Sequence, residues 1–140
     1  QRDRRHYAAD ARLNGTGFLA VGIGAAVGAW LRWGLAAMLN ARFPSLPPGT
    51  LAANILGGFL IGVAMEWFSR RLGLPPELRL LAVTGFLGGL TTFSTFSAEV
   101  VDALMRGHYF WSLAIAASHL VGSLLATIAG MLLVRGLMAA

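Results

Sequence analysis

Apolar residues run along this chain in four long stretches that contain no Asp, Glu, Lys or Arg. The stretches cover 13–31, 43–65, 80–98 and 107–134. A helix needs about 20 apolar residues to cross the roughly 30 Å of hydrocarbon in a bilayer. Because each stretch is near or beyond that length, the pattern predicts four membrane-spanning helices and an all-α membrane protein.

Short polar or proline-containing segments separate these spans, and none is long enough for a second domain. Residues 1–16 are polar and arginine-rich, which predicts a tail, and 17–140 is expected to form a single four-helix transmembrane domain. Span one is expected to cover about 17–39, span two to end near Phe68, span three to cover about 78–105 and span four to run to Arg135.

The composition supports a membrane class and removes others. Hydrophobic residues make up 56% of the chain and charged residues 12%, far from the balance of a soluble domain. Every basic residue is Arg, and the arginines flank apolar spans, where lipid head groups rather than nucleic acid are the expected partner. The chain has no Cys, no paired carboxylates within a span and no His ligand set, so an enzyme is not expected.

Small residues four positions apart occur in every span: Gly24 and Gly28, Gly58 and Gly62, Gly85 and Gly89, and Gly122, Ala126 and Gly130. Such spacing lets helix backbones approach closely in a membrane. We interpret most of these glycines as ordinary packing positions. Gly88 and Gly89, beside a cluster of hydroxyl side chains, are interpreted as a helix break.

That cluster lies in the segment GFLGGLTTFSTFS, residues 85–97, in the middle of span three. Irregular backbone at membrane depth is tolerated mainly where it lines a cavity or binds a ligand. The third helix is therefore expected to be broken near its centre. Phe93 and Phe96 share a helix face there, and their positive ring edges would attract an anion weakly while Ser and Thr hydroxyls donate to it. Alternatively, the rings face lipid or fill the core, and the hydroxyls bond their own helix.

Polar residues in the other spans extend this interpretation. Asn54 lies in an apolar run, where its amide suits an anion or forms a structural bond between helices. Arg32 would supply a positive vestibule or reach lipid head groups. In span four, Ser123 and Thr127 would continue a hydroxyl track, and His119 is a proton site or a packed imidazole. Glu99 faces an aqueous entrance or, with Asp102, marks the interfacial end of its helix.

The distribution of Arg bears on orientation. With four spans, the termini and the second loop share one side, which carries Arg70, Arg71, Arg79 and Arg135 against Arg32, Arg42 and Arg106 on the other. This near balance would let the four-span body insert either way, whereas the tail arginines favour a cytoplasmic amino terminus.

The chain resembles the small fluoride-channel family called Fluc or CrcB over residues 17–134. The segments that carry the resemblance are GAWLRW (28–33), GTLAANILGGFLIG (49–62) and GFLGGLTTFSTFSAE (85–99). The resemblance implies passive fluoride export across the cell (inner) membrane by an antiparallel, dual-topology homodimer with two pores. The tail arginines favour one fixed orientation, whereas dual topology needs a weak charge bias. Because flexible flanking segments count little in the Arg balance, dual topology is expected.

The same resemblance implies roles for particular residues. Phe93 of one subunit and Phe96 of the other would line each pore, and Arg32 would stand in the vestibule. The backbone carbonyls of Gly88 and Thr91 from both chains would hold a structural sodium ion at the dimer centre. The polar lining would comprise Asn54, Ser94, Thr95, Ser123 and Thr127.

Two alternatives stay open at this point. A small proton-coupled multidrug exporter would need a membrane-buried carboxylate in its first span, where this chain has only Arg32 as a charged residue. A structural membrane subunit would explain the small-residue spacings but leaves the buried hydroxyl and Asn track without a purpose.

Overall fold

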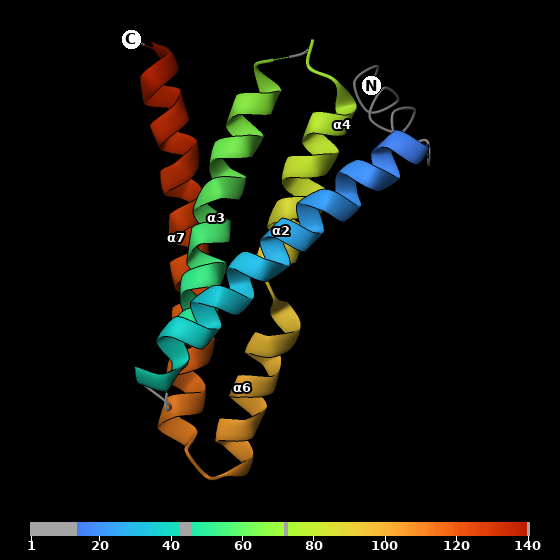
Figure 1. The fold of residues 1–140 in the computed structure, drawn as a ribbon. Coiled ribbons are helices and arrows are strands. Elements are labelled where there is room, and N and C mark those ends of the chain that lie inside the picture. The colour runs from blue at the N-terminus through green and yellow to red at the C-terminus, as the bar shows by residue number, and fades with distance from the viewer. Residues whose placement is uncertain (1–13, 43–45, 72, 140) are drawn as a thin grey trace, which may run out of the picture.

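Four helices that are long and apolar enough to cross a membrane form the described part of the chain in the computed structural model (Figure 1). The structure describes residues 14–42, 46–71 and 73–139. The spans are α2 (Gly15–Leu39), α3 (Pro48–Ser69), a composite third span (Pro76–Met105) and α7 (Tyr109–Ala139). The predictions of four spans and an all-α membrane protein are confirmed.

Local sequence explains where the first two spans begin and how they are joined. Asn14 caps α2 by accepting a hydrogen bond from the Gly17 amide at 2.7 Å. Residues 1–13 of the expected tail lie outside the described residues. The first span begins at Gly15, inside the tail expected over 1–16. After α2, a 3-10 turn, η1 (Asn40–Arg42), places the Asn40 side chain 2.8 Å from the Gly49 amide at the start of α3.

The third span is divided, as the sequence predicts, but at a different place. It consists of α4 (Pro76–Arg79), a π-helical segment η2 (Leu80–Leu87), a short α5 (Gly88–Leu90) and α6 (Phe93–Met105). Thr91 and Thr92 adopt extended backbone angles, with φ/ψ of −83°/154° and −148°/114°. The break therefore lies at these two threonines, and the prediction that Gly88 and Gly89 form it is wrong.

Close approach between helices explains Gly89 instead. A Cβ atom added at Gly89 would lie 3.0 Å from the Cα of Ala25 in α2 and closer still to the Ala25 carbonyl oxygen, nearer than real Cβ contacts come. The same holds between α3 and α7, where a Cβ at Gly130 would lie 2.9 Å from the Val63 amide nitrogen. These glycines let two backbones meet, as the spacing of small residues predicts.

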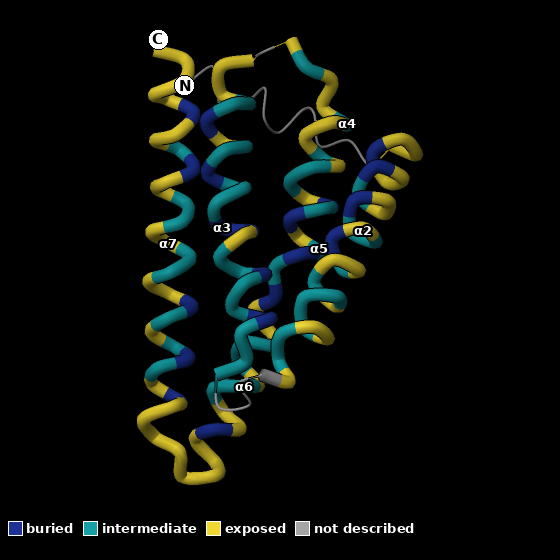
Figure 2. The backbone as a smooth tube through the Cα atoms, turned by 60° about the vertical axis from the view of Figure 1, so that its left-hand side comes forward, coloured by how far each residue is buried: buried dark blue, intermediate teal, exposed yellow. Residues whose placement is uncertain are grey.

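The most extensive packing joins α3 to α7 and α2 to η2. α3 and α7 run side by side along their length, α2 crosses diagonally in front of α3 and η2, and α6 continues the third span toward the opposite end beside α7 (Figure 1). Figure 2 shows that the outward sides of α7 and α2 are largely exposed while the sides between helices are buried. Large apolar side chains such as Phe18, Trp33 and Leu137 are among the exposed ones, which suits a lipid-facing surface.

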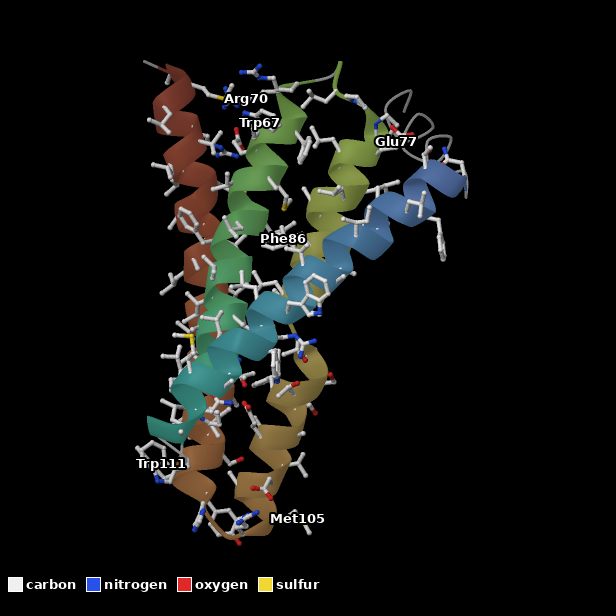
Figure 3. All side chains as sticks on the ribbon, in the orientation of Figure 1. Trp67, Arg70, Glu77, Phe86, Met105 and Trp111 are labelled. Atoms are coloured by element: carbon white, nitrogen blue, oxygen red, sulfur yellow. The ribbon has the colours of Figure 1, made fainter. Side chains whose placement is uncertain are left out.

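A pair of ion-pair contacts joins two helices at one end of the bundle. Trp67 and Arg70 lie at one end, and Met105 and Trp111 lie near the other (Figure 3). At the first end, buried Glu66 of α3 accepts from Arg70 at 2.7 Å and from Arg135 of α7 at 3.0 Å. This pair of contacts ties the carboxyl ends of α3 and α7 together.

Candidate pore site at the break in the third span

The break in the third span is held open by one side chain from another helix. Asn54, in the first third of α3, accepts from the Thr92 amide through Oδ1 at 2.8 Å and donates to the Thr92 carbonyl through Nδ2 at 3.1 Å. An interrupted helix leaves backbone groups without their usual partners, and unpaired groups are costly away from water. The Asn54 side chain supplies an acceptor for the Thr92 amide and a donor for its carbonyl, so α3 fixes the extended conformation of Thr92.

The Thr92 side chain then starts the next helix. Its Oγ1 accepts from the Thr95 amide at 3.1 Å, the N-cap contact of α6. The same oxygen lies 3.0 Å from the Thr95 hydroxyl and 3.2 Å from the Ser94 hydroxyl. Three hydroxyl groups therefore meet at the amino terminus of α6, where the helix dipole favours negative charge.

A cavity of about 700 Å³ opens beside this junction. Of the residues that the sequence identifies, the cavity wall includes Asn54, Gly88, Thr91, Phe93, Phe96 and Ser123. Buried Thr92 and His119 also contribute to it. The wall does not include Ser94, Thr95 or Thr127, so the structure brings most, but not all, of the predicted site residues to one space.

Phe93 and Phe96 lie on one side of α6, as their spacing predicts. Their ring centroids are 5.5 Å apart with the planes at 63°, an edge-to-face arrangement. The Phe93 ring is 79% exposed, whereas Phe96 is half-buried and stacks on His119 with centroids 4.8 Å apart. In a single chain, Phe93 thus projects from the cavity wall with few neighbours.

The hydroxyl track in α7 is shorter than the sequence suggests. Ser123 is half-buried and reaches the cavity. The Thr127 hydroxyl donates to the Ser123 carbonyl at 2.9 Å, one turn earlier in its own helix. The Thr127 hydroxyl is therefore occupied within its own helix, and Thr127 is not part of the cavity wall.

Arg32 points toward the break from α2. Its Nε donates to the Gly89 carbonyl at 3.0 Å, across 57 positions of sequence. A continuous helix would direct the Phe93 amide to that carbonyl and the Thr92 amide to the Gly88 carbonyl. Since Thr92 instead donates to Asn54, the break releases the Gly88 carbonyl from its usual helical partner.

Two ionisable side chains, Glu99 of α6 and His119 of α7, contact residues of neighbouring helices near the break. Glu99 is half-buried and accepts from the Thr50 hydroxyl of α3 at 2.6 Å. Its contact is therefore with a neighbouring helix, and Asp102, one turn on, pairs with Arg106 at 2.9 Å. His119 is buried, and its Nδ1 lies 3.1 Å from the Asn54 Nδ2.

Sequence reasoning missed Thr92 as the central residue of the site. A hydroxyl residue directly before Phe93 and three before Thr95 is a usual start signal for a helix, and that signal was available. The pairing of Thr92 with Asn54 was not, because the two residues are 38 positions apart and meet only through the fold.

This chain is similar to known proteins over most of its length. The model of a family described as "CrcB-like protein, Camphor Resistance (CrcB)" matches residues 19–131. A Cupriavidus pinatubonensis protein named fluoride-specific ion channel FluC is 68% identical over 109 residues, covering 78% of this chain and 86% of the relative. Proteins of the same name from Nitrosospira multiformis and Ralstonia nicotianae are 61% and 59% identical, over 84% and 89% of this chain and 92% and 99% of their own. The chain therefore belongs to the CrcB-like family of multi-pass membrane proteins.

Proposed function

We propose that this chain is a fluoride-selective ion channel of the cell membrane, and not an enzyme, that passes fluoride down its gradient. The observation that carries the proposal is the broken third span clasped by Asn54 beside Phe93 and Phe96. Fluoride is small and strongly hydrated, so a path through the membrane has to replace its water with several donors. The named activity of the relatives, fluoride-specific ion channel, agrees with this chemistry.

The proposed path follows the cavity wall. Asn54 and Ser123 offer an amide and a hydroxyl there, and Phe93 and Phe96 offer positive ring edges. Ser94 and Thr95 add hydroxyls at the amino terminus of α6. The Thr127 hydroxyl now donates to the Ser123 carbonyl, and it would have to break this bond to donate to fluoride at the far end of the path. Arg32, anchored on Gly89, would raise the local concentration of anions in a vestibule.

A second copy of this chain in the opposite orientation would complete each pore. The cavity is partly open at the surface of this chain, and the most exposed aromatic residue in its wall is Phe93, at 79%. A partner that presents its own Phe96 opposite this ring would give each pore one Phe93 and one Phe96. The near balance of Arg between the two ends of the bundle permits both orientations.

A sodium ion at the centre of such a dimer is the structural cofactor that we propose. Gly88 and Thr91 both reach the cavity wall, and the Gly88 carbonyl has lost its helical donor to Asn54. The carbonyls of Gly88 and Thr91 from both chains would supply oxygen ligands without any carboxylate. Broken backbone at membrane depth commonly serves this purpose.

A liposome efflux experiment tests the function directly. Purified protein is reconstituted into vesicles loaded with fluoride, chloride or a cationic dye, and release is followed with ion electrodes or fluorescence. A channel of the proposed kind releases fluoride fast, chloride slowly and the dye not at all. Dye release that depends on a proton gradient would identify a multidrug exporter, and no release of any solute would identify a structural subunit.

A further inference from the structure

His119 lies against Asn54 in the cavity wall, and the proposed fluoride path assigns it no role. It lies in the middle of α7 with an exposure of 4%. Its Nδ1 faces the Asn54 Nδ2 at 3.1 Å, and its ring stacks on Phe96 with an interplanar angle of 28°. Its Nε2 is buried and has no hydrogen-bond partner among the described residues.

The surrounding bonds determine which nitrogen of His119 carries the proton. The Thr92 amide can only donate and its carbonyl can only accept, so they fix the Asn54 side chain with Oδ1 toward the amide and Nδ2 toward the carbonyl. The second hydrogen on Nδ2 then points at His119. Nδ1 must therefore be an unprotonated acceptor, and His119 is the neutral tautomer with its proton on Nε2.

This arrangement uses every donor that Asn54 has. One Nδ2 hydrogen goes to the Thr92 carbonyl and the other to His119 Nδ1. An anion that binds Asn54 must take one of these hydrogens from its acceptor. The bond to the Thr92 carbonyl helps to fix the backbone at the break in the third span. His119 is therefore the acceptor whose displacement leaves the fold intact.

We infer that His119 is a specificity-determining residue: its Nδ1 is a resident acceptor that an anion must displace from Asn54. This inference rests on the proposed function. Fluoride, with its charge concentrated on a small ion, accepts hydrogen bonds more strongly than the larger chloride ion does. The cost of displacing this acceptor is the same for every anion. Fluoride binds strongly enough to keep the site occupied despite this cost, whereas chloride binds weakly and loses occupancy, so the acceptor lowers chloride flux more than fluoride flux.

Three variants at this position separate the possible roles. His119→Phe keeps a ring that can stack on Phe96 but removes the acceptor, so chloride should pass and the fluoride-to-chloride flux ratio should fall about tenfold, the factor that 1.4 kcal/mol represents. His119→Asn places an amide oxygen near the Nδ1 position and should keep the ratio. His119→Gln places its amide near the Nε2 position and should lose it. Ser118→Ala is the matched control, because the Ser118 hydroxyl bonds the Ile115 carbonyl within α7.

A spectroscopic measurement on the wild-type protein does not depend on transport. In ¹⁵N-histidine-labelled protein, the signal absent from His119→Phe is that of His119, and it should show an unprotonated Nδ1 and a protonated Nε2. Adding fluoride should shift the Nδ1 signal as Asn54 leaves it, whereas equal chloride should not.

Each outcome bears on the inference. An Nδ1 that carries the proton, an Nδ1 signal that does not respond to fluoride, or a His119→Phe variant with the wild-type flux ratio would overturn it. Rescue of selectivity by Gln but not Asn would also overturn it, by assigning the role to Nε2. Wild-type vesicles that release no fluoride would instead overturn the proposed function, while the tautomer would still be measured.

Discussion

The Asn54 side chain of α3 bonds both the amide and the carbonyl of Thr92, at 2.8 Å and 3.1 Å, across the break between α5 and α6. One side-chain amide thus replaces the acceptor that the Thr92 amide would have in a continuous helix, and it also donates to the Thr92 carbonyl. The broken helix and the helix beside it are therefore a single structural unit, and the site exists only when both are folded against each other.

Asn54→Ala should destabilise the protein as well as stop transport. The substitution removes the acceptor of the Thr92 amide and one donor to the Thr92 carbonyl, and an unsatisfied buried group costs about 1–3 kcal/mol. We expect a lower melting temperature in detergent and loss of fluoride efflux from liposomes. Leu113→Ala, at an exposed position of α7, is the control and should change neither measurement. Wild-type stability in Asn54→Ala would mean that water or another group satisfies Thr92.

The two phenylalanines should differ in what their loss does. Isoleucine keeps much of the apolar volume and removes the positive ring edge, so Phe93→Ile and Phe96→Ile should both slow fluoride efflux. Phe93 is largely exposed, whereas Phe96 stacks on His119, so only Phe96→Ile should also lower the melting temperature. Wild-type flux in both variants would remove the aromatic rings from the path and leave the hydroxyl groups as its lining.

The amino-acid pattern predicts the membrane architecture well because span length and charge exclusion are local properties of the chain. Four spans, close glycine contacts and a divided third helix all follow from it. The position of the break does not, because Gly88 and Gly89 are consistent with either a break or a close contact. The choice depends on Ala25 of α2, which lies against Gly89, and on Asn54, which lies against Thr92.

The site residues also differ in whether they can be recognised from local sequence or only from contacts between helices. Phe93, Phe96 and Asn54 are recognisable because aromatic and amide side chains stand out in an apolar sequence. Thr127 looks equivalent to Ser123 in sequence, yet its hydroxyl is used by the preceding turn of its own helix. The contact of His119 with Asn54 joins residues 65 positions apart, and no spacing rule could have indicated it.

Glu66 should stabilise the end of the bundle through its two arginine partners. It is 7% exposed and receives Arg70 from its own helix and Arg135 from α7. Glu66→Gln keeps the shape but removes the charge, so the melting temperature should fall, and Arg135→Gln should produce part of the same effect. Arg106→Gln, in an exposed pair with Asp102, is the control and should change little. Equal stability in Glu66→Gln and wild type would mean that the paired charges contribute nothing there.

Opposite orientation of the two copies can be tested with one cysteine. The chain contains no native cysteine, so His108→Cys, in the exposed turn between α6 and α7, gives a single labelling site. A membrane-impermeant thiol reagent applied to one side of sealed membranes should label about half of the protein, and permeabilised membranes should be labelled fully. Complete labelling from one side, or none, would show a single orientation and exclude the antiparallel dimer.

Removal of sodium should weaken the dimer before it affects the helices. The proposed ligands are the backbone carbonyls of Gly88 and Thr91, so no side-chain truncation deletes them, and the ion itself has to be exchanged. Reconstitution in N-methylglucamine salts without sodium should lower both fluoride efflux and the dimer fraction measured by glutaraldehyde cross-linking, because the carbonyls would then face one another unpaired.

Returning sodium should restore both, and lithium and potassium, with other ionic radii, should restore them less completely. Helical content by circular dichroism should stay unchanged throughout, since the bonds within each span do not involve the ion. Full efflux and an unchanged dimer fraction in thoroughly sodium-free vesicles would exclude a structural sodium ion.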